Sequence, residues 1–287
     1  MTNDIDKSIF KAYDIRGIYP ESVNEKAAYL IGRAFVKFLG AKKVVVGRDM
    51  RESGESLFKE LARGITDQGA DLTYIGKVTT PMLNFAVASQ GFDGGIIISA
   101  SHSPKQYNAF KMIQKPVFQI SSDSGMKEIE KLCLENNFEE PDKKGEIVEK
   151  KILEDYKKHI LSLISHVKEM KIVVDYGNGI GAVSGIPVLD ELDVEVINMY
   201  EVPDGNFPNH HPDPTDESTL KILSDKMKEV NADIGIGFTF IKFILLNLPP
   251  RKEEKKVLIG SFGDFMLNLV SFGITPSILI LYWSRRT

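Results

Sequence analysis

Short runs of β-branched and aliphatic residues alternate with stretches of helical periodicity over the first 238 residues. Residues 43–46 (KVVV), 95–99 (GIIIS) and 171–175 (KIVVD) read as buried strands, and residues 53–65 place leucine and isoleucine at helical spacing. Strands that alternate with helices form parallel βαβ units whose sheets are covered on both faces. The alternation therefore predicts an α/β fold with two consecutive domains of mixed or parallel sheet.

A charged stretch at residues 139–151, broken by Pro141 and Gly145, separates two such blocks. A helix over residues 152–167 is expected to link them. The chain has 287 residues, which is too long for one ordinary hydrophobic core. We expect a first domain at residues 1–150, a second at 151–250, and an incomplete or aberrant start of a third at 251–287.

The net charge of −4 hides a change of composition near residue 239. Residues 239–287 carry seven Lys or Arg and three Asp or Glu, a net +4, so the preceding residues carry −8. The chain as a whole lacks the basic excess that nucleic-acid binding favours. Polar residues, glycine and proline interrupt the apolar part of the tail, which argues against a membrane-spanning helix. We therefore expect neither nucleic-acid nor membrane partners. The single cysteine, Cys133, and the lack of an apolar leader favour a cytoplasmic protein.

A dense polar cluster, residues 99–104 (SASHSP), follows directly after the apolar run GIII. In open parallel sheets, ligands bind at the carboxyl ends of strands, so this position favours a functional site. Ser101 is a candidate nucleophile and His102 a candidate proton acceptor or orienting group. A serine hydrolase is disfavoured, because adjacent side chains seldom adopt triad geometry and no G-x-S-x-G elbow surrounds Ser101. A polar turn with a capping serine is the alternative.

Further polar residues occupy defined places along the chain. The segments that contain them are KAYDIRG (11–17), VVVGRDMRESG (44–54), TTPMLNFA (79–86), IIISASHSPKQYNAFKM (96–112), VVDYGNGIGA (173–182) and PDGNFPNHHPDPT (203–215). In this order and spacing they resemble the α-D-phosphohexomutase family, in particular its bacterial phosphomannomutase/phosphoglucomutase branch. The most specific element is the S-x-S-H-x-P-x-x-Y-N-x-x-K run at residues 99–111.

The resemblance implies a phosphoserine enzyme that interconverts hexose 1-phosphate and hexose 6-phosphate through a 1,6-bisphosphate intermediate. Ser101 matches the serine that carries the phosphoryl group, and Lys111 matches the candidate general acid/base. The matched catalytic positions are Ser101, His102, Lys111 and Arg16, and the matched substrate- or phosphate-binding positions are Tyr13 and Asn108. Ser103 and Ala109 stand where the family usually has Asn and Gly. The implied cofactors are Mg²⁺, bound in part through the phosphate on Ser101, and glucose 1,6-bisphosphate as activator and intermediate.

The chain departs from the family at the metal-binding loop. The resemblance places three aspartate ligands of Mg²⁺ at Thr239, Ile241 and Phe243, and Lys242 adds a positive charge between them. None of these residues offers the carboxylate oxygens that a hard cation prefers. The departure coincides with the change of composition. An altered reading frame would produce both changes together, and sequencing the gene would test this hypothesis.

Several alternatives compete with the mutase interpretation. Lys111 alone could be a solvated charge, Arg16 a surface ion pair and Tyr13 half-buried packing. His210 and His211 suggest a metal site, but two neighbouring histidines on an irregular segment seldom form a closed one. Because the metal ligands are missing, we expect impaired turnover, and the second hypothesis is an inactive sugar-phosphate-binding or interaction remnant. The sequence leaves open the choice between glucose and mannose phosphates and the oligomeric state.

Overall fold

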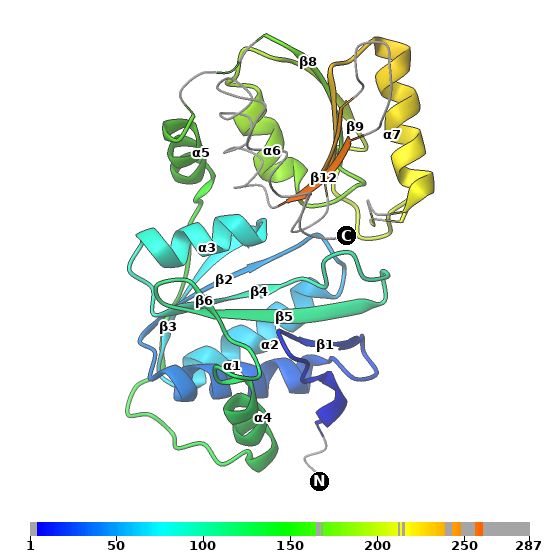
Figure 1. Cartoon of the computed structure of the whole chain (residues 1–287). Helices are drawn as coiled ribbons and strands as arrows, with labels where there is room; N and C mark the ends of the chain where they lie inside the picture. The colour runs from blue at the N-terminus through cyan, green and yellow to red at the C-terminus, as the bar shows by residue number, and fades with distance from the viewer. Residues whose placement is uncertain are drawn as a thin grey trace. The chain divides into compact units, whose positions relative to one another are not determined.

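The structure is a computed structural model of the 287-residue chain, and it describes residues 5–164, 167, 169–211, 213, 216–238, 243–247 and 256–260. The chain divides into two compact units. Unit 1 comprises Met1–Ile152 together with Pro203–Pro208, and unit 2 comprises Leu153–Val202 and Asn209–Thr287. Both units combine helices with a β-sheet (Figure 1), which confirms the predicted α/β class.

Unit 1 contains one mixed sheet of seven strands. Its elements are, in chain order, η1 (Lys7–Ile9), β1 (Ile15–Ile18), α1 (Glu25–Leu39), β2 (Lys43–Arg48), α2 (Gly54–Asp67), β3 (Asp71–Lys77), α3 (Thr80–Ser89), β4 (Gly94–Ile98), β5 (Tyr107–Gln114), β6 (Phe118–Gln119), α4 (Met126–Glu135) and β7 (Ile147–Glu149). The strand order is β1-β5-β4-β2-β3-β7, and β6 pairs with β5. Strands β2, β3, β4 and β7 run parallel, whereas β5 is antiparallel to both β4 and β1.

Helices cover both faces of this sheet, with α3 on one face and α1, α2 and α4 on the other (Figure 1). The core under α1 and α2 includes the fully buried side chains Val44, Val46 and Ile96, each of which contributes about 1.5–3 kcal/mol through burial. Helices α1 and α2 approach closely, because a Cβ added to Gly32 would lie 2.5 Å from the carbonyl oxygen of Leu61.

Unit 2 contains a five-stranded sheet of order β12-β11-β10-β8-β9. Its elements are α5 (Leu153–Ser162), β8 (Lys171–Asp175), α6 (Ala182–Leu189), β9 (Glu195–Met199), α7 (Glu217–Val230), β10 (Ile234–Phe238), β11 (Phe243–Asn247) and β12 (Lys256–Gly260). Strand β8 runs parallel to β9 and β10, and β10, β11 and β12 follow one another antiparallel. Figure 1 shows α7 and α6 on opposite faces of this sheet.

The helix expected to extend to residue 167 ends earlier, at Ser162. Its final turn tightens, because the amides of Leu163 and Ile164 donate to the carbonyls three residues before them, Ile160 and Leu161. Such i→i−3 bonds are typical of helix termini. Within the part of the chain that the structure describes, no helix combines the length and apolarity needed to cross a bilayer.

Candidate active site

The candidate site lies at the carboxyl end of two neighbouring parallel strands of unit 1. Strands β2 and β4 pair in register, with Arg48 opposite Ile98, so the loops that follow them leave the same edge of the sheet. The amide of Asp49 donates to the carbonyl of Ile98 over 3.0 Å, which ties the two loops together at their start. The carboxyl edge of a parallel sheet is the usual place for ligands, as the sequence analysis expected.

Ser101 lies in the loop after β4 in an uncommon backbone conformation. Its φ angle is 56°, in the left-handed region, which costs a residue other than glycine about 1–3 kcal/mol. The residue is only 3% exposed, and its Oγ lies 3.3 Å from Nδ1 of the exposed His102 ring. Strained conformations of this kind persist only where the surrounding structure imposes them, and they cluster at functional sites.

Two cations converge on one carboxylate beside this loop. Oδ2 of the buried Asp14 accepts hydrogen bonds from Nη2 and Nε of Arg16, at 2.6 and 3.2 Å. It also lies 3.4 Å from Nζ of Lys111. Nη1 of Arg16 donates to Oγ of Ser103 over 2.9 Å, which connects the cations to the loop that carries Ser101. The structure thus brings Arg16 and Lys111 together, through a carboxylate that sequence reasoning did not single out.

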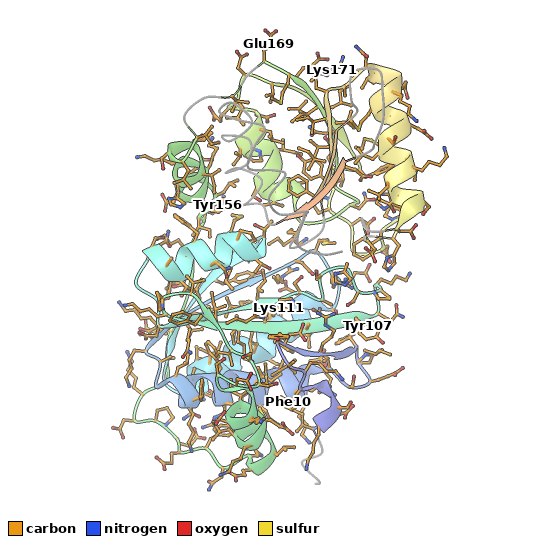
Figure 2. All side chains as sticks on the ribbon, in the orientation of Figure 1. Phe10, Tyr107, Lys111, Tyr156, Glu169 and Lys171 are labelled. Atoms are coloured by element: carbon orange, nitrogen blue, oxygen red, sulfur yellow. The ribbon has the colours of Figure 1, made fainter. Side chains whose placement is uncertain are left out.

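Lys111 is positioned by β5, on which Figure 2 labels it together with Tyr107. Strand pairing places it opposite Ile97 of β4, one residue before β4 ends. Burial lowers the pKa of Lys111 below its ordinary value, and Asp14 opposes this effect while Arg16 adds to it. A lysine whose pKa is lowered exchanges protons more readily near neutral pH, which suits a general acid or base.

The two predicted binding residues lie in contrasting environments. The side chain of Tyr13 is 66% exposed, next to Asp14 in the chain. Asn108 is fully buried; its Nδ2 donates to Oγ of Ser53 over 2.8 Å and its Oδ1 accepts from the amide of Ala109. These contacts give Asn108 a role in joining β5 to the start of α2. A direct contact of either residue with substrate stays a prediction.

Arg51 is the functional candidate that sequence reasoning missed. It follows β2 and is almost entirely buried, and both Nη atoms donate to backbone carbonyls of the Ser101 loop. Every residue type has a backbone carbonyl acceptor, so no pattern of side chains predicts such a contact. The only available indication was the position of Arg51 inside the segment GRDMRESG, directly after a predicted strand.

The residues that follow β10 do not fit the Mg²⁺ site that the resemblance implies. Thr239 and Ile241 lie outside the described residues, and Phe243 opens β11, where it pairs with Phe238. Hydroxyl and hydrocarbon side chains at these positions replace the oxygen-rich donor set that Mg²⁺ requires. Among the residues described, no group of three or more His, Cys, Asp or Glu side chains could hold a metal ion.

His210 makes an ion pair instead of a metal site. Its Nε2 lies 3.1 and 3.2 Å from the two carboxylate oxygens of Asp175, at the end of β8, and its Nδ1 lies 2.8 Å from the carbonyl of His211. The hydrogen bond to Asp175 raises the pKa of His210, whereas burial lowers it. Both ring nitrogens face oxygen acceptors, an arrangement that the doubly protonated ring satisfies with two N–H donors.

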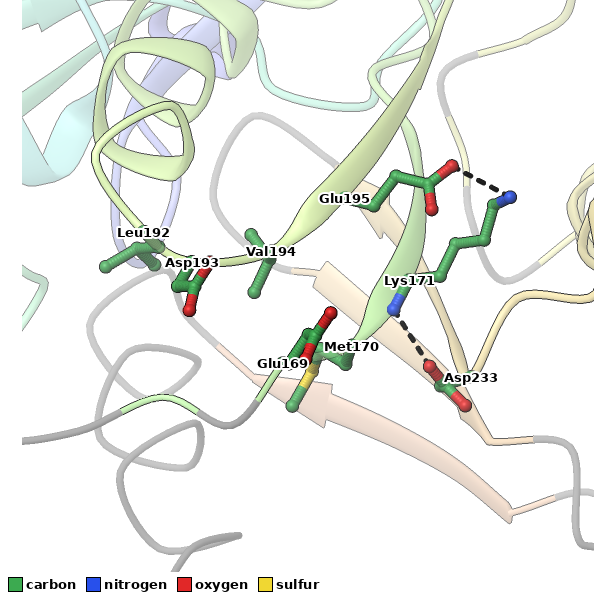
Figure 3. Close-up of a pocket in the computed structure, with 8 residues that line it drawn as sticks. All are labelled: Glu169, Met170, Lys171, Leu192, Asp193, Val194, Glu195 and Asp233. Carbon is green, nitrogen blue, oxygen red and sulfur yellow. Dashed lines mark hydrogen bonds and ion pairs between the residues drawn. The ribbon is translucent and has the colours of Figure 1, made fainter.

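An open pocket of about 500 Å³ lies in unit 2, at the amino ends of β8 and β9 (Figure 3). Its lining residues are Glu169, Met170, Lys171, Leu192, Asp193, Val194, Glu195 and Asp233. Lys171 donates its amide to Asp233 and pairs its Nζ with Glu195, both at 2.8 Å. The pocket lies at the opposite end of β8 from Asp175, and none of the predicted site residues lines it.

Two family models match the chain. Residues 7–140 match the phosphoglucomutase/phosphomannomutase α/β/α domain I, and residues 154–239 match α/β/α domain II of the same family. Together these ranges contain the Ser101 loop, the Asp14–Arg16 segment and the Asp175–His210 pair.

Similar proteins carry related names. A phosphoglucomutase of Neisseria meningitidis is 38% identical over 238 residues, which cover 82% of this chain and 51% of that protein. A phosphomannomutase of Escherichia coli is 38% identical over 243 residues, covering 80% and 52%. A crystal structure of a phosphoglucomutase/phosphomannomutase family protein from Burkholderia thailandensis superposes with a TM-score of 0.80 at 34% identity, covering 85% of this chain and 55% of that one. The chain thus spans about half the length of the curated relatives it matches.

Proposed function

Because the chain belongs to the phosphoglucomutase/phosphomannomutase family, we propose that unit 1 supplies the phosphoryl-carrying part of a hexose phosphate mutase. The observation that supports this most is the arrangement of Arg16 and Lys111 on Asp14, beside the buried and conformationally strained Ser101. Phosphoryl transfer depends mainly on positioning and on charge stabilisation, and this loop offers both. The proposed partner is a hexose phosphate, and glucose 1,6-bisphosphate is the proposed phosphoryl donor.

The proposed reaction exchanges one P–O bond for another. Oγ of Ser101 bonds to phosphorus of the donor while the bond from that phosphorus to the sugar oxygen breaks. The hydroxyl proton passes from Oγ to His102, whose Nδ1 lies 3.3 Å away, and the departing sugar oxygen receives a proton from the Lys111 ammonium. In the return step the free hydroxyl of a hexose monophosphate attacks phosphorus of the phosphoserine and gives its proton to Lys111. The bond from phosphorus to Oγ of Ser101 breaks, and His102 returns a proton to Oγ.

The remaining residues hold and neutralise the transferred group. Arg16 is a permanent cation with planar donors that match phosphate oxygens. Its Nη1 is already directed to Ser103, in the loop of the nucleophile. Tyr13 is exposed enough to contact a sugar, and Asn108 acts through Ser53 by fixing the beginning of β5 to the start of α2. A cytoplasmic location, favoured by the single cysteine, stays a prediction.

Dependence on Mg²⁺ is a general property of the family, but the residues of this chain do not fit the ion, and no step is assigned to it. We therefore propose slow turnover for this chain. The same observation favours a second candidate function, a sugar-phosphate-binding protein without turnover, because Arg16 and Lys111 are present while the carboxylates expected at residues 239, 241 and 243 are not.

Intact-mass measurement after incubation with glucose 1,6-bisphosphate tests the proposal. We expect a gain of about 80 Da, one phosphoryl group, in the unaltered chain and in the control variant Ser89→Ala. The exposed Ser89 ends α3, and its hydroxyl donates to the carbonyl of Phe85 within that helix. Ser101→Ala should gain nothing. Binding in a calorimeter without a mass gain would support the second candidate, and neither binding nor a mass gain would refute both.

A further inference from the structure

The guanidinium of Arg51 is buried directly beneath the loop that carries Ser101. The residue is 1% exposed, which is unusual for arginine unless its charge is paired and its donors are satisfied. It is not part of the group of residues that face a phosphate in the proposed reaction, so its burial requires a separate explanation.

Four hydrogen bonds from the Nη atoms of Arg51 end on backbone carbonyls of one short segment. Nη2 donates to Ser101 at 2.9 Å and to Ser103 at 2.6 Å. Nη1 donates to Pro104 at 2.8 Å and to Tyr107 at 3.0 Å. One side chain therefore fixes the loop at its nucleophile, at its middle and at the point where β5 begins.

A buried carboxylate compensates the charge of Arg51. Oδ2 of the fully buried Asp49 lies 3.4 Å from Nε of Arg51, and its Oδ1 accepts the backbone amide of the same residue at 2.9 Å. Burial raises the pKa of Asp49, and Arg51 opposes the rise. A lysine could balance the charge of Asp49, but its three donors lack the planar fork that reaches four carbonyls.

Residues 205–207 of unit 1, far from Arg51 in the sequence, pack against this arginine and its neighbour. The ring of Phe207 lies 5.4 Å from Cζ of Arg51, within the range of a cation–π contact. Nδ2 of the neighbouring Asn206 donates to Glu52 over 3.1 Å. A Cβ added to Gly205 would lie 3.0 Å from Cα of Arg51, so a glycine permits the close approach of this segment.

We propose that Arg51 is a positioning residue, which holds the loop of residues 101–107 in the form that keeps Ser101 left-handed and competent to accept a phosphoryl group. The inference has two halves: first, that Arg51 holds the loop, and second, that the held loop accepts a phosphoryl group. Only the second half rests on the proposed function. Holding the loop is a property of the folded chain, and it can be measured without any phosphate.

Hydrogen exchange tests the first half, with Arg51→Lys as the variant and Arg63→Lys as the control, because Arg63 pairs with Glu60 on the exposed face of α2. We expect amide exchange in residues 99–107 of Arg51→Lys to accelerate about tenfold, the effect of losing roughly one net hydrogen bond. Exchange in β2 and β4 should stay as in the unaltered chain, and the control should match it throughout. Acceleration that extends over β2 and β4, or none in the loop, would overturn the proposal.

A second variant keeps the proposal testable if Arg51→Lys does not fold. Phe207→Ala leaves the guanidinium in place and removes its cover, and it should accelerate exchange in the same loop amides by a smaller factor. If Arg51→Lys does not fold, unchanged loop exchange in Phe207→Ala would overturn the proposal.

The rate of phosphoryl uptake tests the second half. With glucose 1,6-bisphosphate varied to saturation, Arg51→Lys should lower the maximal rate about 100-fold, as a misplaced nucleophile does, and leave the half-saturating concentration unchanged. A change confined to the half-saturating concentration would assign Arg51 to binding and refute positioning. If the unaltered chain takes up no phosphate, the proposed function fails, while the exchange result still decides whether Arg51 holds the loop.

Discussion

Asp14 and Lys111, 97 residues apart in the chain, meet at 3.4 Å between Oδ2 and Nζ. The same oxygen also binds Arg16. One carboxylate thus orients both cations, and its residue directly precedes β1, the strand that pairs with β5. This relationship makes Asp14 the residue through which the charge state of the candidate site can be changed most directly.

Asp14→Asn is expected to lower the pKa of Lys111 further. Burial lowers the pKa of this lysine and Asp14 raises it, so removing the carboxylate leaves the lowering effects unopposed. An NMR titration of the lysine Nζ should therefore show deprotonation at lower pH, and phosphoryl uptake by Ser101 should slow by about tenfold. The exposed Asp123 supplies the control Asp123→Asn, which should change neither quantity. A higher pKa in Asp14→Asn would contradict the assignment.

Ser101→Gly is expected to separate stability from function. Glycine adopts positive φ without steric cost, whereas alanine at φ 56° keeps the strain. Ser101→Gly should therefore have a free energy of unfolding about 1 kcal/mol larger than that of Ser101→Ala. It should accordingly unfold at a higher urea concentration. Both variants should fail to gain a phosphoryl group in intact-mass measurement. Equal stabilities would show that the left-handed conformation carries no strain.

The ion pair of His210 with Asp175 predicts a dependence of stability on pH. The pKa of His210 is raised in the folded chain above its ordinary value of 6.5. Its contribution to stability is therefore complete below about pH 6.5 and is lost as pH rises through the raised pKa. The difference in urea midpoint between the unaltered chain and His210→Gln should shrink with rising pH across this window. His159→Gln, on the exposed side of α5, serves as the control for replacing a histidine. A difference between the unaltered chain and His210→Gln that grows with pH would refute the assignment.

Removing divalent metal is expected to leave phosphoryl uptake by this chain unchanged. Thr239, Ile241 and Phe243 offer no carboxylate, so EDTA should alter neither the mass gain of Ser101 nor the affinity for glucose 1,6-bisphosphate. Replacing all three with aspartate should introduce a response to millimolar Mg²⁺, seen as a higher melting temperature. Loss of the mass gain on EDTA treatment of the unaltered chain would show that other residues bind the ion.

The parts of the fold that sequence reasoning predicted are those with strong local patterns. Residues 171–175 form β8 as expected, and residues 54–65 of the predicted helix 53–65 lie within α2, with Ser53 at its N-cap. Helix α1 was not anticipated, although Asn24 caps it and Gly40 ends it in the left-handed conformation. Its buried face is defined by packing against α2, and that contact depends on glycines whose role is not visible in a hydrophobic pattern.

The residues of the candidate site likewise fall into those that the sequence predicted and those that it did not. Ser101, Lys111 and Arg16 could be named from motifs, because their side chains define those motifs. The contacts of Arg51 with carbonyls around 50 residues away and the convergence on Asp14 depend on strand register. Register is a property of the assembled sheet, so single-sequence reasoning had no means of identifying them.

The shared carboxylate also sets the sign of the local electric field. Arg16, Lys111 and Asp14 have formal charges that leave one positive charge beside Ser101. A phosphoseryl group adds about two negative charges, which reverses the sign to about −1. The unmodified loop therefore attracts anionic sugar phosphates and the phosphorylated loop repels them. Association of the two forms with the same ligand should respond in opposite directions to added salt.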